Sequence, residues 1–428
     1  MSDKILTNGD PVLENLVTNP TIEAPKEIKV DEVKLQRVAR PLRHVKNIPV
    51  KAQVFHSDKG PITFSYENKI KLPIPKNKLV VDVNYVGLNP VDLKIKNGYT
   101  QAIYGEVGLG REYSGVITHV GENLTDKWSE GDEVFGIYFH PHLAKGALQT
   151  AILVNPNEDP ILLRPENVDP REAAGALFVL GTAFNILDKL DKRGYLKQDS
   201  NVLINGGTSS VGMCAIQLLK RYYQLTKKIV VITTGSSAEA LRTFYTDLEG
   251  EIIYVDYLKC RGKSSKPLRA MIEEQRTTVF DPTTGDEIKI QYLQGKFDIV
   301  LDFVGGYDIV AHSSYLIHKN GAYLTTVGDY VANYKTDVYN QWDNPKANMR
   351  KAFGSLLYSY DYTHFYFDPN AKTAAKNDWI NKCGEFLKTG VVTCRIDKVY
   401  NWNDIDEAIS YMKTQRAQGK LILKVERF

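Results

Sequence analysis

A glycine-rich loop between a buried strand and a helix is the part of this sequence best suited to bind phosphate. The sequence NVLINGGTSSVGMCAIQLLK supplies that strand, loop and helix in order. Gly206 permits a tight turn, and Gly212 lets the helix pack closely on the strand. The first helical turn offers amide groups and a positive dipole to a pyrophosphate. The loop therefore predicts a dinucleotide site.

This loop departs from the usual fingerprint at Ser209, where the backbone must approach the phosphates most closely. Ser209 and Ser210 add bulk there, although a serine hydroxyl can also donate a hydrogen bond to phosphate. Two interpretations remain: a loop that binds a dinucleotide, and a fold that has kept its shape without a ligand. The complete strand–loop–helix context favours binding. The predicted contacts are Gly206, Ser209, Ser210, Val211 and Gly212.

The end of the following strand bears on which nicotinamide cofactor fits. NAD-binding folds place Asp or Glu there for the ribose 2′-hydroxyl, whereas this sequence continues as Thr234, Gly235, Ser236 and Ser237. Small hydroxyl side chains leave room for a 2′-phosphate, so NADPH is favoured over NADH. The nearest basic residue along the sequence is Arg242, so the preference rests on space rather than on charge.

The elements that must position this loop divide the chain into regions of different pattern. Residues 171–354 alternate buried strands with helices, which predicts a Rossmann-type doubly wound parallel sheet of the α/β class. Residues 48–170 hold short strands and glycine turns, which indicates a partly closed β-barrel. The strand, helix and strand expected near the C-terminus return to the barrel, so we assign it residues 48–170 and 355–428. Two stretches, 259–295 and 329–372, are longer than a connection needs.

Composition excludes several classes of protein. The 428 residues suit two domains, and a net charge of +3 is too small to indicate nucleic-acid binding. The four cysteines include no C-x-x-C pair, so no zinc ribbon or redox motif is expected. The sequence lacks both an apolar run long enough to span a bilayer and an N-terminal secretory signal. We expect a cytoplasmic protein, and attachment to a membrane surface stays open.

Residues 1–47 are predicted to be a flexible tail whose charge changes sign. Residues 1–32 are polar and mostly acidic, and no acidic residue occurs between Val33 and Ser57. We call five basic residues of this stretch the basic arm: Lys34, Arg37, Arg40, Arg43 and Lys46. It either docks on an anionic membrane, at about 1 kcal/mol per basic residue, or is a solvated arm against its own domain. The general behaviour of charge runs favours the second interpretation.

Several motifs occur together and in order: VGLNPVDLKIKNG, GREYSGVITHVG, GDEVFG, NGGTSSVG, FDIVLDFVGG and GKLILKV. With them the chain resembles the quinone-oxidoreductase branch of the medium-chain dehydrogenase/reductase superfamily. The resemblance implies a GroES-like catalytic-type domain beside the Rossmann domain. Zinc-dependent members have Cys and His where this chain has Asn89 and Arg111. The resemblance therefore implies a zinc-free protein, and any activity would be NADPH-dependent reduction of a quinone or enone.

The same resemblance implies a pocket. Asn89 would direct its amide at the substrate carbonyl, with Lys94 and Tyr99 nearby. Alternatively, Asn89 only caps the turn before Pro90, since Asn-Pro is a common turn opener. The residues implied around the cofactor, besides the loop and Ser236 and Ser237, are Gly181, Thr182, Tyr257, Gly305, Val327 and Gly328.

A closer resemblance covers the whole chain, through RVARPLRHVK, FSYENKIKLPIPKNKLVV, NGGTSSVGM, SYDYTHFYFDPN and TQRAQGKLILKV. These segments are similar to the fungal ATPase-stabilising (Ast) proteins. The resemblance implies an accessory role in delivering the plasma-membrane proton-ATPase to the cell surface, with peripheral attachment to membranes and raft fractions. It is compatible with a homodimer. The aromatic segment 358–367 would then be a contact patch or, alternatively, a cover over the domain cleft.

Overall fold

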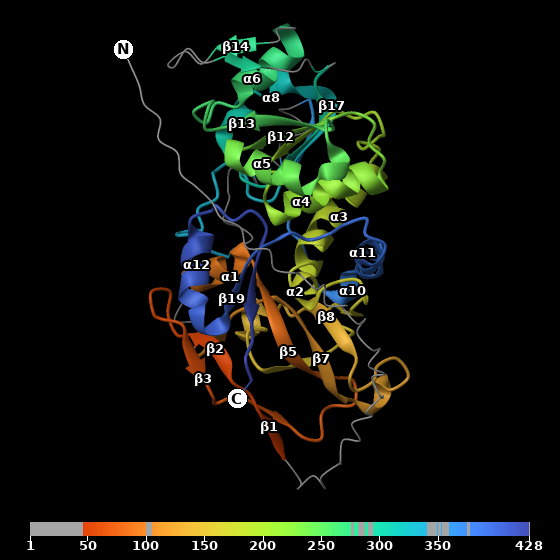
Figure 1. Ribbon diagram of the computed structural model, residues 1–428, viewed down its shortest axis with the longest axis vertical. Helices are drawn as coiled ribbons and strands as arrows, with labels where there is room; N and C mark the ends of the chain where they lie inside the picture. The colour runs from red at the N-terminus through yellow and green to blue at the C-terminus, as the bar shows by residue number, and fades with distance from the viewer. Residues whose placement is uncertain are drawn as a thin grey trace, which may run out of the picture. The chain divides into compact units, whose positions relative to one another are not determined.

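The computed structural model describes residues 46–427 apart from 100–104, 275–277, 281–286, 290–292, 294, 340–348, 350–351, 353–358 and 375–376. The segment Lys46–Phe428 is a compact unit by itself. Figure 1 shows its β-rich region and its α/β region. Of the basic arm, only Lys46 is described, and Lys34, Arg37, Arg40 and Arg43 lie outside the described residues.

The α/β region contains a six-stranded sheet of order β13-β12-β11-β16-β17-β18. Every pairing in it is parallel. This is the strand order of a dinucleotide-binding Rossmann fold, with the glycine-rich loop following the first strand. The predicted fold is therefore confirmed. The strands are β11 Val202–Asn205, β12 Ile229–Thr233, β13 Ile252–Asp256, β16 Phe297–Asp302, β17 Ile317–Thr325 and β18 Asp361–His364.

Helices flank this sheet, whose central strands are buried along almost their whole length. Helix α2 (Pro170–Ala173) and helix α3 (Leu177–Lys192) are separated by a break at 174–176. A Cβ on Gly175 would lie 2.9 Å from the Ile422 side chain and 3.0 Å from that of Lys420, so the break brings the backbone against a strand. The helices named below are α2 Pro170–Ala173, α3 Leu177–Lys192, α4 Ser210–Gln217, α5 Gly235–Phe244, α7 Tyr307–Ala311 and α11 Trp379–Lys388.

The domain boundary predicted after residue 354 differs from the structure. Strand β18 pairs with β17, and the Tyr323 and Tyr362 rings stack with centroids 5.4 Å apart. Helix α11 packs on α3 through Phe184 and Phe386, whose centroids lie 5.6 Å apart. Burial of these aromatic rings holds β18 and α11 in the Rossmann region. The chain returns to the β-rich region only at β19 (Ile396–Asn401).

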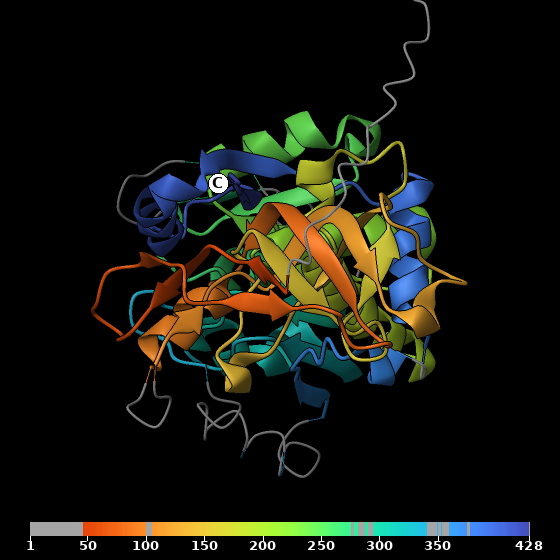
Figure 2. The ribbon, with the colours of Figure 1, turned by 90° about the horizontal axis from the view of Figure 1, so that it is seen from below.

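The β-rich region is built on a sheet of order β10-β8-β7-β5-β20-β19, in which β9 also pairs with β5 (Figure 2). Its last two strands flank α12 (Ile405–Lys413), so the predicted strand–helix–strand close is confirmed. Lys51, which precedes these strands in the sequence, packs over the rings of Phe64 and Trp402 and so belongs to the β-rich region. The remaining elements used below are β5 Leu79–Leu88, α1 Pro90–Asn97, β7 Glu112–Val120, β8 Glu133–Ile137, β9 Ala151–Val154, β10 Ile161–Leu163 and β20 Lys420–Lys424.

Across the described part of the chain, no helix has the length and apolar character needed to cross a bilayer.

The centre of the β sheet gives a stability prediction. Gly115 of β7 lies between β5 and β8, and a Cβ there would meet the Asp82 carbonyl oxygen at 2.1 Å. Because the backbone must move, Gly115→Ala should lower the free energy of unfolding by about 1–3 kcal/mol or more. A shift in the denaturant midpoint measures this loss.

The matched control is Gly384→Ala in α11, where the new methyl group meets only the flexible Leu162 side chain, at 3.0 Å. Alanine is favoured over glycine in a helix by roughly 0.5–1 kcal/mol, so this variant should not lose stability. Equal losses in both variants would contradict the assigned strand register.

Candidate functional site

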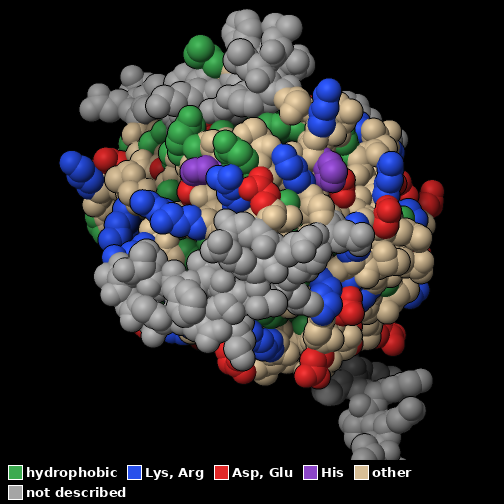
Figure 3. Space-filling view, turned by 90° about the horizontal axis from the view of Figure 1, so that it is seen from above, with side chains coloured by type: hydrophobic (Ala, Val, Ile, Leu, Met, Phe, Trp, Pro, Cys, Tyr) green, Lys and Arg blue, Asp and Glu red, His purple; other side chains and the backbone are tan. Residues whose placement is uncertain are grey.

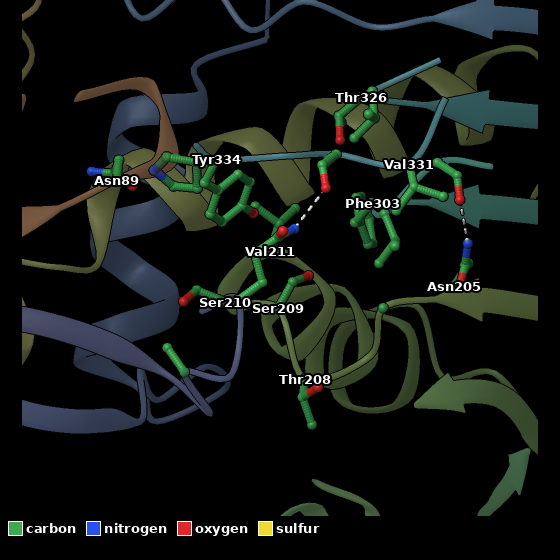
Figure 4. A pocket seen from close by; sticks show the side chains of 18 of the residues that line it. Asn89, Asn205, Thr208, Ser209, Ser210, Val211, Phe303, Thr326, Val331 and Tyr334 are labelled. Atoms are coloured by element: carbon green, nitrogen blue, oxygen red, sulfur yellow. Dashed lines mark hydrogen bonds between the residues drawn. The ribbon is translucent and has the colours of Figure 1, made fainter. Parts of the chain in front are cut away.

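A cavity of about 880 Å³ lies between the β-rich and Rossmann regions. In Figure 4, Ser209, Ser210 and Val211 lie on one side of it, Phe303 and Val331 on another, and Asn89 at its far end. The cavity thus brings together the glycine-rich loop and the residues expected around a substrate. Its position outside the carboxyl ends of parallel strands is where open α/β sheets bind ligands.

The glycine-rich loop has the tight geometry that its sequence predicts. Gly206 has a φ of +86°, which favours glycine, and a Cβ on Gly207 would lie 2.2 Å from Val231. A Cβ on Gly212 would lie 2.5 Å from the Gly206 carbonyl oxygen, so Gly212 packs helix on loop rather than lining the cavity. The Ser209 hydroxyl oxygen accepts from the Gly212 amide at 3.0 Å and caps α4. Ser209, Ser210 and Val211 still line the cavity.

Beyond the glycine-rich loop, Ser237 and Tyr257 line the cavity together with Arg416. Arg416 donates to the Tyr257 hydroxyl at 3.2 Å, and Gln418 donates to the Ser237 hydroxyl at 3.4 Å. Ser236 does not contact the cavity, and its hydroxyl lies 3.2 Å from that of Thr234. Arg416 is the cation that the sequence analysis missed here, because it comes from the loop after α12, far along the chain.

The turn after β16 is organised by one buried carboxylate. Asp302 accepts from the Tyr323 hydroxyl at 2.6 Å, the Asn205 amide group at 2.8 Å and the Gly305 amide at 2.8 Å. Burial raises the pKa of Asp302, and these hydrogen bonds oppose the rise. The carboxylate thereby ties Gly305, which lines the cavity, to the strand that precedes the glycine-rich loop.

The remaining predicted cofactor residues divide into two groups. Val327 and Thr182 line the cavity. Gly328 does not, and its amide donates to the Thr325 hydroxyl at 2.9 Å. Gly181 does not either, because its missing side chain makes room for the rings of Phe367 and Trp379.

Asn89 lies at the cavity wall, but its amide is already engaged within the protein. The amide nitrogen donates to Glu112 at 2.7 Å, and the amide oxygen accepts from Lys420 at 2.9 Å. Its backbone amide also donates to Asp92, at 2.9 Å, at the start of α1. The structure thus favours a structural role for Asn89 at the start of α1 over a role as a hydrogen-bond donor to a substrate carbonyl. Lys94 lines the cavity as expected.

Tyr99 was predicted in the same pocket, and the structure places it elsewhere. Its ring packs edge-on against Phe55, with centroids 5.8 Å apart, and its hydroxyl donates to the Gly105 carbonyl at 3.3 Å. The partly buried ring packs against the core of the β-rich region and does not line the cavity, because Tyr99 lies beyond the end of α1 at Asn97.

Two buried ion pairs occupy the floor behind Asn89. Lys420 lies 2.6 Å from Glu112, with side chains 3% and 0% exposed, and Arg111 lies 3.3 Å from Asp92. Glu112 also accepts from the Phe178 amide at the start of α3, at 3.1 Å. Burial raises the pKa of Asp92 and lowers the pKa of Arg111, and each charge lessens the shift of the other.

This floor does not fit a zinc ion. At the two positions where the resemblance implies zinc ligands in other members, this chain has the Arg111 guanidinium and the Asn89 amide, and both are committed to protein partners. Within the described ranges, no three His, Cys, Asp or Glu side chains gather as a metal site would need. A nicotinamide nucleotide fits better, because the glycine turn and the capped helix line an open cavity.

The chain is similar to known dehydrogenase domains and to two yeast proteins along its whole length. Residues 75–154 match the alcohol dehydrogenase GroES-like domain, and residues 276–423 match the zinc-binding dehydrogenase family. Protein AST1 and Protein AST2 of Saccharomyces cerevisiae (strain ATCC 204508 / S288c) are each 64% identical to this chain, over 429 and 430 residues. Both alignments cover 100% of the chain and of the relative. The chain belongs to the Ast family.

Solved structures agree on the fold. A quinone oxidoreductase from Coxiella burnetii superposes with a TM-score of 0.63 at 18% identity, covering 89% of this chain and 99% of its own. The human synaptic vesicle membrane protein VAT-1 homolog-like protein gives 0.61 at 16% identity, with the same coverage. The medium-chain dehydrogenase/reductase fold of this Ast-family chain is therefore confirmed, with its GroES-like and Rossmann domains.

The buried Glu112–Lys420 pair gives a quantitative prediction. Lys420→Met should leave the Glu112 carboxylate buried without its cation and lower the unfolding free energy by about 3–5 kcal/mol. Adding Glu112→Gln should recover a substantial part of this loss, because the remaining groups are neutral. Denaturant unfolding of the two single variants and the double variant measures the coupling. Additive losses would show that the two side chains do not interact energetically.

Proposed function

We propose that this Ast-family chain is an accessory protein on a reductase scaffold that helps deliver and stabilise the plasma-membrane proton-ATPase. The Ast resemblance supplies the partner. The observation that supports a role beyond a reductase is the extent of the relationship. AST1 and AST2 align over the whole chain, whereas the reductase-type structures cover 88–89% of it.

Peripheral membrane attachment through the basic arm is part of this proposal. On the described part of the face in Figure 3, Lys and Arg side chains are interspersed with Asp and Glu. The basic arm instead carries one sign of charge over a stretch without acidic residues. Such a segment is attracted to an anionic leaflet and loses that attraction as salt screens it.

The arm can be tested on the full chain by replacing its five basic residues with Gln. Binding to phosphatidylserine-containing vesicles should fall by at least tenfold, because each basic residue near the surface contributes about 1 kcal/mol. In cells, less proton-ATPase should reach the surface. Sedimentation with vesicles and surface labelling of the ATPase measure the two effects.

The matched control neutralises five exposed lysines of the folded region: Lys59, Lys69, Lys71, Lys127 and Lys197. It should bind vesicles like the parent chain. Unchanged vesicle binding and ATPase delivery in the arm variant would remove the arm from the proposal.

A second candidate function is zinc-independent reduction of a quinone or enone with NADPH. The cavity supports it, since it joins a nucleotide groove to an aromatic chamber. Bound NADPH would supply the hydride. The chain's own residues would hold the phosphates at the glycine-rich loop. Arg416, which lines the same cavity as Ser237 and donates to the Tyr257 hydroxyl, would supply the cation for a 2′-phosphate. Ring-lined walls would keep water from the reacting atoms.

Nucleotide binding gives a direct test. Calorimetry and thermal shift should detect NADPH with higher affinity than NADH. Arg416→Ala should weaken NADPH binding about tenfold or more, since a hydrogen bond to a charged group contributes roughly 1.5–3 kcal/mol, and should change NADH binding little. Ser209→Trp should abolish both by filling the groove.

Arg242→Ala is the matched control, because Arg242 packs over the Tyr254 ring instead of lining the cavity. It should leave both affinities unchanged. Absence of NADPH binding to the parent chain would eliminate the reductase candidate and leave the accessory role.

A further inference from the structure

Four aromatic side chains from four separate segments line one side of the cavity, and we call them the aromatic wall. They are Phe139 after β8, Phe178 in α3, Tyr339 after β17 and Phe367 after β18. Each ring meets the next at a steep angle. The centroids are 5.9 Å apart from Tyr339 to Phe139, 5.8 Å from Phe139 to Phe178 and 5.4 Å from Phe178 to Phe367. Tilted and edge-to-face contacts of this kind fix the orientation of each ring.

Phe367 is the end of the wall that is held most firmly. Its ring packs edge-on against Trp379, with centroids 5.2 Å apart, and Trp379 is 1% exposed. A Cβ on Gly181 of α3 would lie 2.8 Å from the tip of the Phe367 ring and 2.8 Å from Trp379. Because helix and tryptophan leave no space behind it, the Phe367 ring has little room to move away from the cavity.

Two polar side chains that line the cavity with the wall, Thr182 and Asn89, already have partners within the protein. The Thr182 hydroxyl donates to the Phe178 carbonyl at 2.7 Å, and both polar ends of the Asn89 amide are engaged by Glu112 and Lys420. A ligand at this wall is therefore recognised mainly by its apolar surface. Rings suit it better than a flexible chain, because they match fixed ring edges at a lower cost in conformational entropy.

We propose that the aromatic wall makes this pocket select neutral, flat ligands with two or three fused rings, and that Phe367 sets the length accepted. The proposal rests on the reductase candidate and names its substrate class. It also makes Phe367 a specificity-determining residue. Phe367 and Trp379, which follow β18 and begin α11, thereby belong to the ligand site as well as to the fold.

The experiment measures binding without turnover on the full chain, with and without NADPH. Calorimetry with cyclohexanone, 1-tetralone and 9-fluorenone compares one, two and three rings. Each added ring should tighten binding about fivefold to tenfold, from the apolar area it removes from water. The linear ketone 2-decanone tests the chain alternative, and tighter binding of 2-decanone than of 9-fluorenone would overturn the proposal.

Two substitutions at one position act through opposite changes of volume. Phe367→Trp should shorten the chamber, so that 9-fluorenone binds at least tenfold more weakly while cyclohexanone stays within about twofold. Phe367→Ala should remove the contact, so that 9-fluorenone loses its advantage over 1-tetralone. Tyr222→Ala is the control, because Tyr222 packs against Phe184 and Phe386 and does not line the cavity. It should keep the parent ranking.

The outcomes separate this proposal from the reductase candidate. Ring ranking that depends on Phe367, in a chain that oxidises no NADPH, would support the wall and eliminate the reductase. NADPH oxidation with a ranking that ignores ring number, or that both Phe367 variants preserve, would overturn the wall alone. Melting temperatures of each variant identify a loss of fold, and Phe367→Ala decides the matter if Phe367→Trp does not fold.

Discussion

The buried ion pair between Glu112 and Lys420 connects parts of the chain that lie far apart in sequence. Lys420 begins the last strand, Glu112 begins β7, and the Glu112 carboxylate also accepts from the first turn of α3. Burying two charges has a large desolvation cost, which their attraction and added hydrogen bonds must offset. Here Asn89 and the Leu88 carbonyl supply those bonds. The position of the cavity floor against α3 follows from satisfying these charges together.

Buried polar groups must also find partners on the opposite side of the cavity. At the carboxyl ends of the parallel strands, loops must turn sharply without leaving such groups unpaired. The Asp302 carboxylate satisfies these groups by accepting hydrogen bonds from Asn205, Gly305 and Tyr323. The ion pairs of the floor fill the space behind Asn89 and Arg111, and the cavity stays open beside them.

Local pattern was enough to predict the Rossmann sheet and the glycine-rich loop, because strand, turn and helix propensities act over a few residues. It was not enough for Arg416, which reaches Tyr257 from 159 positions along the chain. It also failed for β18, a short strand with polar residues whose place depends on the stacking of Tyr362 on Tyr323. Tyr99 was misplaced because the sequence does not show where the chain turns after α1. Long-range packing decides all three.

The proposed accessory role and the proposed ligand binding rest on residues that do not overlap. The basic arm ends at Lys46, before the first described strand, and the cavity is lined from Leu88 onward. The segment 329–372, which is longer than a connection needs, contributes Tyr339 and Phe367 to the aromatic wall. Within the aromatic segment 358–367, Phe365, Tyr366 and Phe367 line the cavity, which favours a cover over the cleft rather than a contact patch. A scaffold that only bound a partner would not need rings packed inward around a cavity, so an accessory role does not by itself account for this pocket.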